Sequence, residues 1–503
     1  MYIGDYLARR CVYSPEKIAL IDVGQQPAAR FIFRELNDRA NRVANWLRSQ
    51  GVGKGDRVGM LAKDGVHFYD ALFACGKLGA IFVPYTWRWH PEEIAGQIQQ
   101  TTPKILIYES DLAKPVRSQR PDRFVELSNF LEQTTQNSSV EPVTCESLTE
   151  DDTACLLFTG GTTGTPKAAQ ISHRQIVWNT FNAHLADVQG SDVYLNIFPL
   201  YHTGGFFSFA VPILILGGTV IQTRKFEAEQ VLELIEKERV TIFAGVPTVF
   251  QQLTQASNWK KADLSSLRYC LSGGAPLPLN LIEIYQREKN VVFRQGFGMT
   301  EFGPDVFSLS AEDSLRKMGS IGKPNFFVDA RIVDPETNQP LPPNEVGELV
   351  LRGPVATTGY FNNPKATRQA FDDENYFHTG DLAYMDEEGY FYIVDRLKDM
   401  YISGGENIYP AEIEKVLYQH PAVHMCAVVG VDDEKWGQVG WAFVVLKEGQ
   451  QTTEQELLDF LAQHLAKFKI PKKVIFRNQL PISGAGKILK QELKESIKNQ
   501  KSF

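Results

Sequence analysis

Helical and strand patterns alternate along roughly the first 350 residues of the 503-residue chain. Residues 33–51 place apolar side chains on one helical face and end at a glycine, and a strand pattern follows at 56–62. The same change from helix to strand recurs at 232–247 and at 281–298. Such alternation predicts parallel β-sheets covered by helices, with ligands bound at the carboxyl ends of the strands.

The length and composition describe a globular chain with more than one domain. A chain of 503 residues is too long for one compact core, and 43% apolar with 22% charged residues is ordinary for a folded protein. The net charge of −8 gives no reason to expect nucleic acid as a partner. We therefore expect small-molecule ligands and no nucleic acid.

Targeting and redox signals favour a reducing cytoplasm. The first residues, MYIGDYLARRCVYSPEK, lack a basic stretch followed by an apolar core, so we expect no secretory signal. The most apolar segment, 204–221, is interrupted by Pro212 and predicts a buried helix and strand, not a transmembrane segment. The six cysteines show no C-x-x-C spacing, which argues against a zinc site or a disulfide framework.

The pattern changes after about residue 319, where short β-prone segments are separated by Pro, Asn and Gly turns. We expect a β-barrel-like subdomain there, and a smaller α+β region after Arg396. The predicted fold is therefore α/β. A large N-terminal domain of helix-covered β-sheets with the barrel-like subdomain spans 1–396, and a small α+β C-terminal domain spans 397–503.

A glycine- and threonine-rich loop follows one predicted strand in LLFTGGTTGTPKAAQISH, residues 156–173. Backbone N–H groups, hydroxyls and one lysine suit a polyanion such as a triphosphate. The loop is not a G-x-x-x-x-G-K-[ST] phosphate loop, because Thr165 and Pro166 precede the lysine and Ala168 replaces the hydroxyl. A short strand and a helix capped by Ser172 should follow, and a plain turn remains the alternative.

Four motifs together resemble the adenylate-forming (AMP-binding) superfamily, in its acyl-CoA synthetase or carboxylic acid–CoA ligase branch. They are TGGTTGTPK, QGFGMTE (295–301), the run from HTGD to PAEIE (378–414) and LPISGAGKILKQEL (480–493), which cover nearly the whole chain in order. The resemblance implies ATP, Mg²⁺ and coenzyme A. A carboxylate attacks the α-phosphorus of ATP and releases pyrophosphate, and a thiol then displaces AMP from the acyl-adenylate.

The resemblance also implies roles for five residues around ATP. Phe297 would stack on adenine, Thr300 would contact phosphate as a catalytic group, and Glu301 would be catalytic and bind Mg²⁺. Asp381 would accept hydrogen bonds from the ribose hydroxyls, and Arg396 would lie near ribose and phosphate. Relatives usually carry Tyr where this chain has Phe297. The structural alternatives are core packing for Phe297 and a solvated surface position for Glu301. For Asp381 and Arg396 they are a turn cap and a surface ion pair.

Further cofactor-binding positions follow from the same resemblance. They are Thr159, Gly160, Gly161, Thr162, Thr163, Gly164, Lys167, Gly273, Gly274, Ala275, Gln295, Gly296, Gly298, Ile393, Gly404 and Gly405. The pair Gly404 and Gly405 would leave room for the pantetheine arm of CoA, which resembles CoA ligases more than peptide-synthetase adenylation domains.

The C-terminal domain should be mobile and carry the catalytic lysine. By resemblance, Lys487 bridges the substrate carboxylate and the α-phosphate, whereas Lys490 and Lys494 should be solvated. Lys398 matches the hinge between two conformations, with an ordinary exposed lysine as the alternative.

The acyl pocket should draw on 199–209, 243–248, 272–276 and 296–303. His202 would be a catalytic-site residue beside the substrate carboxylate or at the pocket entrance, with a structural histidine as the alternative. Many Gly and Phe residues favour an apolar aliphatic or aryl acid, and no charged residue in these loops indicates a second anionic group.

Two other functions stay open at this point. The chain could load an acyl group onto a carrier-protein phosphopantetheine, or it could be a non-catalytic sensor of acyl groups or nucleotides. The expected partners are a small carboxylic acid, ATP and CoA, and a homodimer is left open.

Overall fold

The computed structural model describes residues 2–116, 123–136, 139–159, 166–274, 277–482 and 488–500. The chain forms two compact units. The first unit comprises the described residues up to Thr159, with Pro166–Asp329 and Leu351–Phe377, and the second comprises Ala330–Val350 and the described residues from His378 onward. The boundary predicted at 396/397 within the C-terminal part stays a prediction.

A nine-stranded sheet forms one half of the first unit. Its order is β15 (Lys323–Pro324), β14 (Gly303–Leu309), β13 (Phe293–Met299), β12 (Tyr269–Gly273), β11 (Ile242–Gly245), β9 (Val193–Asn196), β10 (Thr219–Gln222), β1 (Ile18–Asp22) and β2 (Ala29–Ile32). Neighbouring strands from β13 to β1 are parallel, and the pairs at the two ends are antiparallel. The alternation of helix and strand patterns therefore predicted the central sheet correctly.

A six-stranded sheet forms the other half of this unit. Its order is β6 (Phe124–Glu126), β5 (Ile105–Tyr108), β3 (Arg57–Leu61), β4 (Ile81–Pro84), β7 (Thr153–Thr159) and β8 (Lys167–Ser172). The strands are parallel except for β8, which runs antiparallel to β7. The predicted glycine-rich loop thus joins two neighbouring strands.

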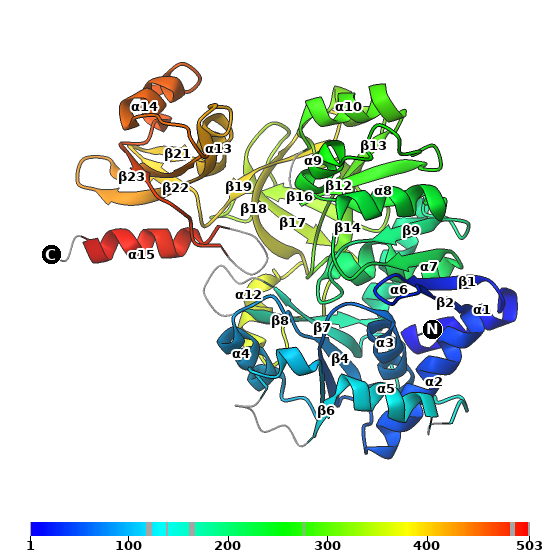
Figure 1. The fold of residues 1–503 in the computed structure, drawn as a ribbon. Helices are drawn as coiled ribbons and strands as arrows, with labels where there is room; N and C mark the ends of the chain where they lie inside the picture. The colour runs from blue at the N-terminus through cyan, green and yellow to red at the C-terminus, as the bar shows by residue number, and fades with distance from the viewer. Residues whose placement is uncertain are drawn as a thin grey trace. The chain divides into compact units, whose positions relative to one another are not determined.

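Helices lie against both sheets of the first unit (Figure 1). They are α1 (Tyr6–Tyr13), α2 (Phe33–Ser49), α3 (Val66–Leu78), α4 (Pro91–Thr101), α5 (Leu127–Gln136), α6 (His173–Leu185), α7 (Ala210–Leu216), α8 (Ala228–Lys237), α9 (Pro247–Gln255), α10 (Leu279–Lys289), α11 (Asp313–Arg316) and α12 (Pro364–Ala370). Short 3₁₀ turns η1 (Ile3–Asp5) and η2 (Ser110–Leu112) and a π-helix η3 (Gly204–Ser208) complete the set. As predicted, Ser172 caps α6, because its hydroxyl accepts from the Gln175 N–H at 3.1 Å.

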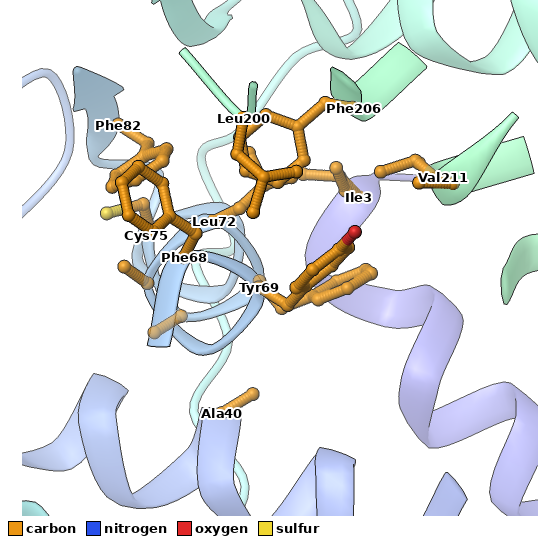
Figure 2. Packing of buried hydrophobic residues seen from close by; sticks show 14 of the residues in the cluster. Ile3, Ala40, Phe68, Tyr69, Leu72, Cys75, Phe82, Leu200, Phe206 and Val211 are labelled. Carbon is orange, nitrogen blue, oxygen red and sulfur yellow. The ribbon is translucent and has the colours of Figure 1, made fainter. Parts of the chain in front are cut away.

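Aromatic side chains of α3, β4 and η3 form part of the largest core. Phe206 of η3 packs edge-on against Tyr69 of α3 and Phe82 of β4, with ring centroids 5.5 and 6.2 Å apart. Figure 2 shows these rings together with Leu200, which comes from the loop between β9 and η3. The segment at 204–221 is buried helix and strand, as predicted, and it ties the loop at 199–203 to the core.

The second unit contains two further sheets. The β-rich region expected from about residue 319 is a four-stranded sheet, in the order β16 (Asp329–Val333), β17 (Gly347–Arg352), β18 (Phe377–Met385) and β19 (Phe391–Arg396). The second sheet has the order β21 (Glu406–Ile408), β20 (Tyr401–Ser403), β23 (Gly437–Leu446) and β22 (Val423–Asp433), with β24 (Lys473–Phe476) also paired to β23. The helices are α13 (Pro410–Leu417), α14 (Glu454–Ala462), η4 (Lys467–Lys469) and α15 (Lys490–Gln500). The predicted α+β segment after Arg396 is confirmed.

Two chain-wide features bear on the predicted environment. Among the helices that the structure describes, none is both long and apolar enough to cross a membrane. All six cysteines are free thiols.

Candidate active site

Four parallel strands of the nine-stranded sheet end at one edge. Gly245 of β11 lies opposite Ser272 of β12, and Gly273 of β12 lies opposite Gly296 of β13. Strand β9 runs parallel to β11 on the other side. The loops that leave these strands are therefore neighbours, and they are the loops that sequence reasoning assigned to ATP and the acid.

Glycines allow the backbone of these loops to approach closely. Gly274 has φ +79°, which favours glycine. A Cβ on Gly298 would lie 1.8 Å from the Pro304 carbonyl oxygen, so no larger residue fits without moving the backbone. A Cβ on Gly273 would lie 3.3 Å from the Gly296 carbonyl oxygen, which is a milder restriction.

The motif at 295–301 begins with one structural residue and one accessible aromatic ring. Gln295 is 7% exposed, and its Oε1 accepts from the Leu277 N–H at 3.2 Å. Gln295 thus fixes the segment that follows β12. Phe297 is half-buried and meets Phe307 edge-on at 5.9 Å, so part of its surface stays open to a ligand.

Glu301 is a buried carboxylate held in place by a residue that sequence reasoning missed. Thr300 and Glu301 are each 9% exposed. The Tyr360 hydroxyl donates to Glu301 Oε1 at 2.9 Å, and the Glu301 carbonyl accepts from the Thr357 N–H at 2.7 Å. Burial, aided by the Glu301 carboxylate, raises the pKa of Tyr360, so the phenol stays protonated and keeps donating.

The chemistry of Glu301 fits the implied Mg²⁺. Protein-bound Mg²⁺ is usually held by one or two carboxylates together with waters and substrate phosphates. A single oriented carboxylate meets that requirement, because the triphosphate itself supplies the other charged ligands.

Lys167 is the first residue of β8, directly after the predicted phosphate loop. Its Nζ is 4.9 Å from the centroid of the Tyr360 ring, which is cation–π distance. The Thr159 hydroxyl donates to the Lys167 carbonyl at 3.3 Å and closes the base of the loop. Tyr360 therefore contacts both the phosphate-loop lysine and the carboxylate proposed to bind Mg²⁺.

Several predicted residues cannot be placed. They are Gly160, Gly161, Thr162, Thr163, Gly164, Ala275 and Lys487, which lie outside the described residues.

The loop that carries His202 is anchored by neighbouring residues. His202 is exposed, and its Nδ1 accepts from the Gly204 N–H at 3.2 Å within the same turn. The Leu200 N–H donates to Asp64 Oδ1 at 2.8 Å. Burial raises the pKa of Asp64 to about 7. Sequence reasoning missed Asp64, which follows β3 and is far from this loop in the chain.

In the second unit, Asp381 and Arg396 face each other on paired strands. Asp381 of β18 is 3% exposed and lies opposite Arg396 of β19. Arg396 Nε donates to Asp381 Oδ1 at 2.6 Å. The two residues predicted to contact ribose thus form one ion pair, and Ile393 on the same strand is half-buried opposite Ala383.

The predicted hinge and pantetheine residues lie farther along the second unit. Lys398 lies in the turn between β19 and β20. Partial desolvation of its amino group, aided by Arg396 and opposed by Asp399, lowers the pKa of Lys398. Gly404 has φ +62° and Gly405 has φ +90°. The Gly404 N–H donates to the Trp436 carbonyl at 2.8 Å, and a Cβ on Gly404 would lie 2.8 Å from the Trp436 ring.

One lysine prediction was wrong. Lys490 is not solvated, because its Nζ donates to Glu414 Oε1 at 2.8 Å and its side chain is only 16% exposed. Burial opposes its charge, but the Glu414 carboxylate outweighs burial and raises the pKa of Lys490. Lys494 is half-buried.

Comparisons with known proteins identify the family of the chain. The model of the AMP-binding enzyme family matches residues 7–361, and that of the AMP-binding enzyme C-terminal domain matches 412–487. The chain is 40% identical over 494 residues to a feruloyl-CoA synthase from Amycolatopsis sp, covering 98% of each chain. It is 35% identical over 503 residues to the long-chain-fatty-acid–CoA ligase FadD13 of Mycobacterium tuberculosis, again covering 98% of each.

A solved structure of a CoA synthetase has the same fold as this chain. The o-succinylbenzoate CoA synthetase of Bacillus subtilis, in complex with its acyl-adenylate OSB-AMP, superposes with a TM-score of 0.88 at 32% identity, covering 97% of this chain and 98% of that one. The chain belongs to the AMP-binding enzyme family. The predicted resemblance and the α/β fold are both confirmed.

Proposed function

We propose that this chain is an ATP-dependent carboxylic acid–CoA ligase that acts on an apolar aryl or aliphatic acid through an acyl-adenylate. It is an AMP-forming acid–thiol ligase and uses ATP, Mg²⁺ and CoA. The observation that carries the proposal is the buried Glu301 carboxylate, oriented by the Tyr360 hydroxyl at the edge where four parallel strands end. Transfer to a carrier protein and a non-catalytic sensor are not favoured, since the relatives named above are CoA ligases.

In the first step, a substrate carboxylate oxygen bonds to the α-phosphorus and the bond to pyrophosphate breaks. Negative charge has to be gathered around one phosphorus atom, so positioned cations and N–H donors dominate catalysis. Lys167 of the first unit is proposed to supply positive charge for this step. Bound Mg²⁺ would neutralise phosphate charge, and Glu301 would hold it.

In the second step, the CoA sulfur bonds to the acyl carbonyl carbon and AMP leaves. This step no longer brings two anions together, so it does not need Lys487 in the same way. Gly404 and Gly405 are proposed to border the pantetheine arm. The change between steps is proposed to turn the 397–503 domain about Lys398.

The substrate class follows from the loops and from the relatives. Phe206 and Phe207 of η3 are buried beside the loop at 199–203, and the relatives act on feruloyl, long-chain fatty and o-succinylbenzoate groups. An apolar pocket suits an aryl or aliphatic tail.

The test identifies products across a panel of aryl and aliphatic acids, with ATP and Mg²⁺, with and without CoA. We expect AMP, pyrophosphate and acyl-CoA from at least one acid, and a Lys487→Ala variant that has lost adenylation. Lys447→Ala, which removes an exposed lysine, is the matched control and should keep full activity. Formation of ADP, or pyrophosphate release with no acyl-CoA from any acid, would overturn the proposal.

A cytoplasmic location is supported by the six free thiols, which suit a reducing compartment. The homodimer stays a prediction, and light scattering on the purified chain would show twice the mass of one chain if it is right.

A further inference from the structure

Asp305 lies on an irregular stretch of β14, next to the proposed active site. Phe297 of β13 pairs with Phe307 of β14, but Met299 pairs with Gly303. An advance of two residues along β13 therefore corresponds to four residues along β14. The intervening residues of β14 therefore form a bulge. Bulges commonly redirect a side chain near an active site.

One oxygen of the Asp305 carboxyl is enclosed and unpaired. Its Oδ2 has less than 1 Å² of exposed surface and no hydrogen-bond partner within the part of the chain that the structure describes. The Asp305 backbone is held instead, because its carbonyl accepts from Asn325 Nδ2 at 2.9 Å. Burial raises the pKa of Asp305 to about 8. A buried carboxyl oxygen without a hydrogen bond lowers stability, so such a group in a folded protein often has a functional role.

Asp305 is nevertheless not wholly enclosed. The residue as a whole is only half-buried, although its Oδ2 is enclosed. Strand β14 packs against α6 and η3, and η3 belongs to one of the segments predicted to form the acyl pocket. Asp305 itself follows the segment 296–303 by two residues, so it lay outside the segments that the sequence assigned to the acyl pocket.

The nearby polar groups leave Asp305 available. Burial, together with the negative charge of Tyr69 and Asp305, raises the pKa of Tyr194, which places Asp305 near the Tyr194 phenol of β9. That phenol already donates to Asn196 Oδ1 at 3.3 Å. Asn179 Nδ2 of α6 donates to the Phe207 carbonyl at 2.6 Å. Both of these donors are engaged elsewhere, which leaves Asp305 Oδ2 open to a hydrogen bond from a ligand.

We infer that Asp305 determines substrate specificity by hydrogen-bonding a neutral hydroxyl on the tail of the acid, remote from the carboxylate that reacts. This inference rests on the proposed function. A hydroxyl can donate to the ionised carboxyl or accept from the protonated one, so either state is satisfied. A tail with only C–H groups leaves Asp305 unpaired. A tail with a second carboxylate, as in o-succinylbenzoate, adds like charge beside it.

The expected preference for a hydroxylated acid over the matched deoxy acid is large. Sites built to bind a substrate hydroxyl discriminate strongly against the analogue that lacks it, because a buried polar group of the site then stays unpaired. We expect kcat/KM for the hydroxylated acid to exceed that for the matched deoxy acid by about 10- to 100-fold.

The experiment compares matched acids that differ in one hydroxyl. The pairs are 4-hydroxycinnamic acid with cinnamic acid, and 12-hydroxydodecanoic acid with dodecanoic acid, and the decisive pair is whichever the wild type converts. The variants are Asp305→Asn, which keeps the shape, and Asp305→Leu, which removes all polarity. Asp329→Asn is the control, because it removes an exposed carboxylate that is 61% accessible and paired with Arg352.

The inference predicts a hydroxyl preference in the wild type that Asp305→Leu abolishes and Asp305→Asn reduces, with Asp329→Asn unchanged. It also predicts that the melting temperature of Asp305→Asn is not below that of the wild type, since an unpaired buried carboxyl has been removed. Equal kcat/KM for the two acids of the converted pair, or a preference that survives in folded Asp305→Leu, would overturn the inference. No acyl-CoA from any acid would instead refute the proposed function.

Discussion

Replacing Tyr360 by Phe removes a single hydroxyl and tests whether the orientation of Glu301 matters. That hydroxyl donates to Glu301 Oε1 at 2.9 Å in a site where Glu301 is 9% exposed. A hydrogen bond to a charged group contributes about 1.5–3 kcal/mol, which corresponds to a factor of about 10 to 150. The Thr357 N–H still holds the Glu301 backbone in the variant, so we expect the lower half of that range.

The assay measures acid-dependent pyrophosphate release as a function of free Mg²⁺. We expect Tyr360→Phe to lower the adenylation rate by about 10- to 30-fold and to raise the Mg²⁺ concentration needed for half-maximal rate, because the carboxylate is less well placed. A purely structural role would lower stability without shifting the Mg²⁺ dependence.

Tyr285→Phe is the matched control. The Tyr285 hydroxyl is also buried and donates to the Phe250 carbonyl at 2.9 Å, away from the proposed site. We expect it to lower stability by about 1 kcal/mol and to leave the Mg²⁺ dependence unchanged. If Tyr360→Phe matched the wild type within twofold in rate and in Mg²⁺ dependence, the role assigned to Glu301 would be refuted.

Three further predictions use other parts of the structure. Gly298→Ala should lower the melting temperature and abolish adenylation, because its Cβ would lie 1.8 Å from the Pro304 carbonyl oxygen. Gly96→Ala is the control and should be neutral or stabilising, because no atom lies within 4 Å of the added Cβ. Equal melting temperatures for the two variants in calorimetry would contradict this prediction. Asp381→Asn should weaken ATP binding about tenfold in titration calorimetry, since a buried charged acceptor is lost, and unchanged binding would count against the ribose contact. Burial lowers the pKa of His173 from its ordinary value near 6.5 to about 4. Between about pH 6.5 and pH 4, the unfolded chain therefore binds a proton at His173 that the folded chain does not. Unfolding free energy should therefore fall by up to about 1.4 kcal/mol per pH unit on acidification in that window, and His173→Gln should show a shallower slope in urea titrations; parallel slopes would refute it.

Local signals in the sequence predicted most of the fold. The helix at 33–51 was predicted from five apolar residues on one face, and all five are buried in α2. The cap at Ser172 and the strands of the C-terminal segment were likewise predictable, because periodicity and capping depend on neighbouring residues.

The contacts that complete the site could not be predicted in this way. Tyr360 lies 59 positions from Glu301 in the chain, and its sequence context is an ordinary turn. Asp305 is isolated by a bulge that only the pairing of two strands reveals. The pairing of Lys490 with Glu414 contradicted its expected exposure, because the helix period alone does not show which face packs. All three features depend on contacts between residues that are far apart in the chain.

The most direct test of the account is acid-dependent exchange of radiolabelled pyrophosphate into ATP, measured without CoA. An acyl-adenylate intermediate predicts exchange in the presence of an accepted acid and Mg²⁺, none without the acid, and strong loss in Lys487→Ala. Exchange that required CoA, or that occurred without any acid, would contradict formation of an acyl-adenylate at this site.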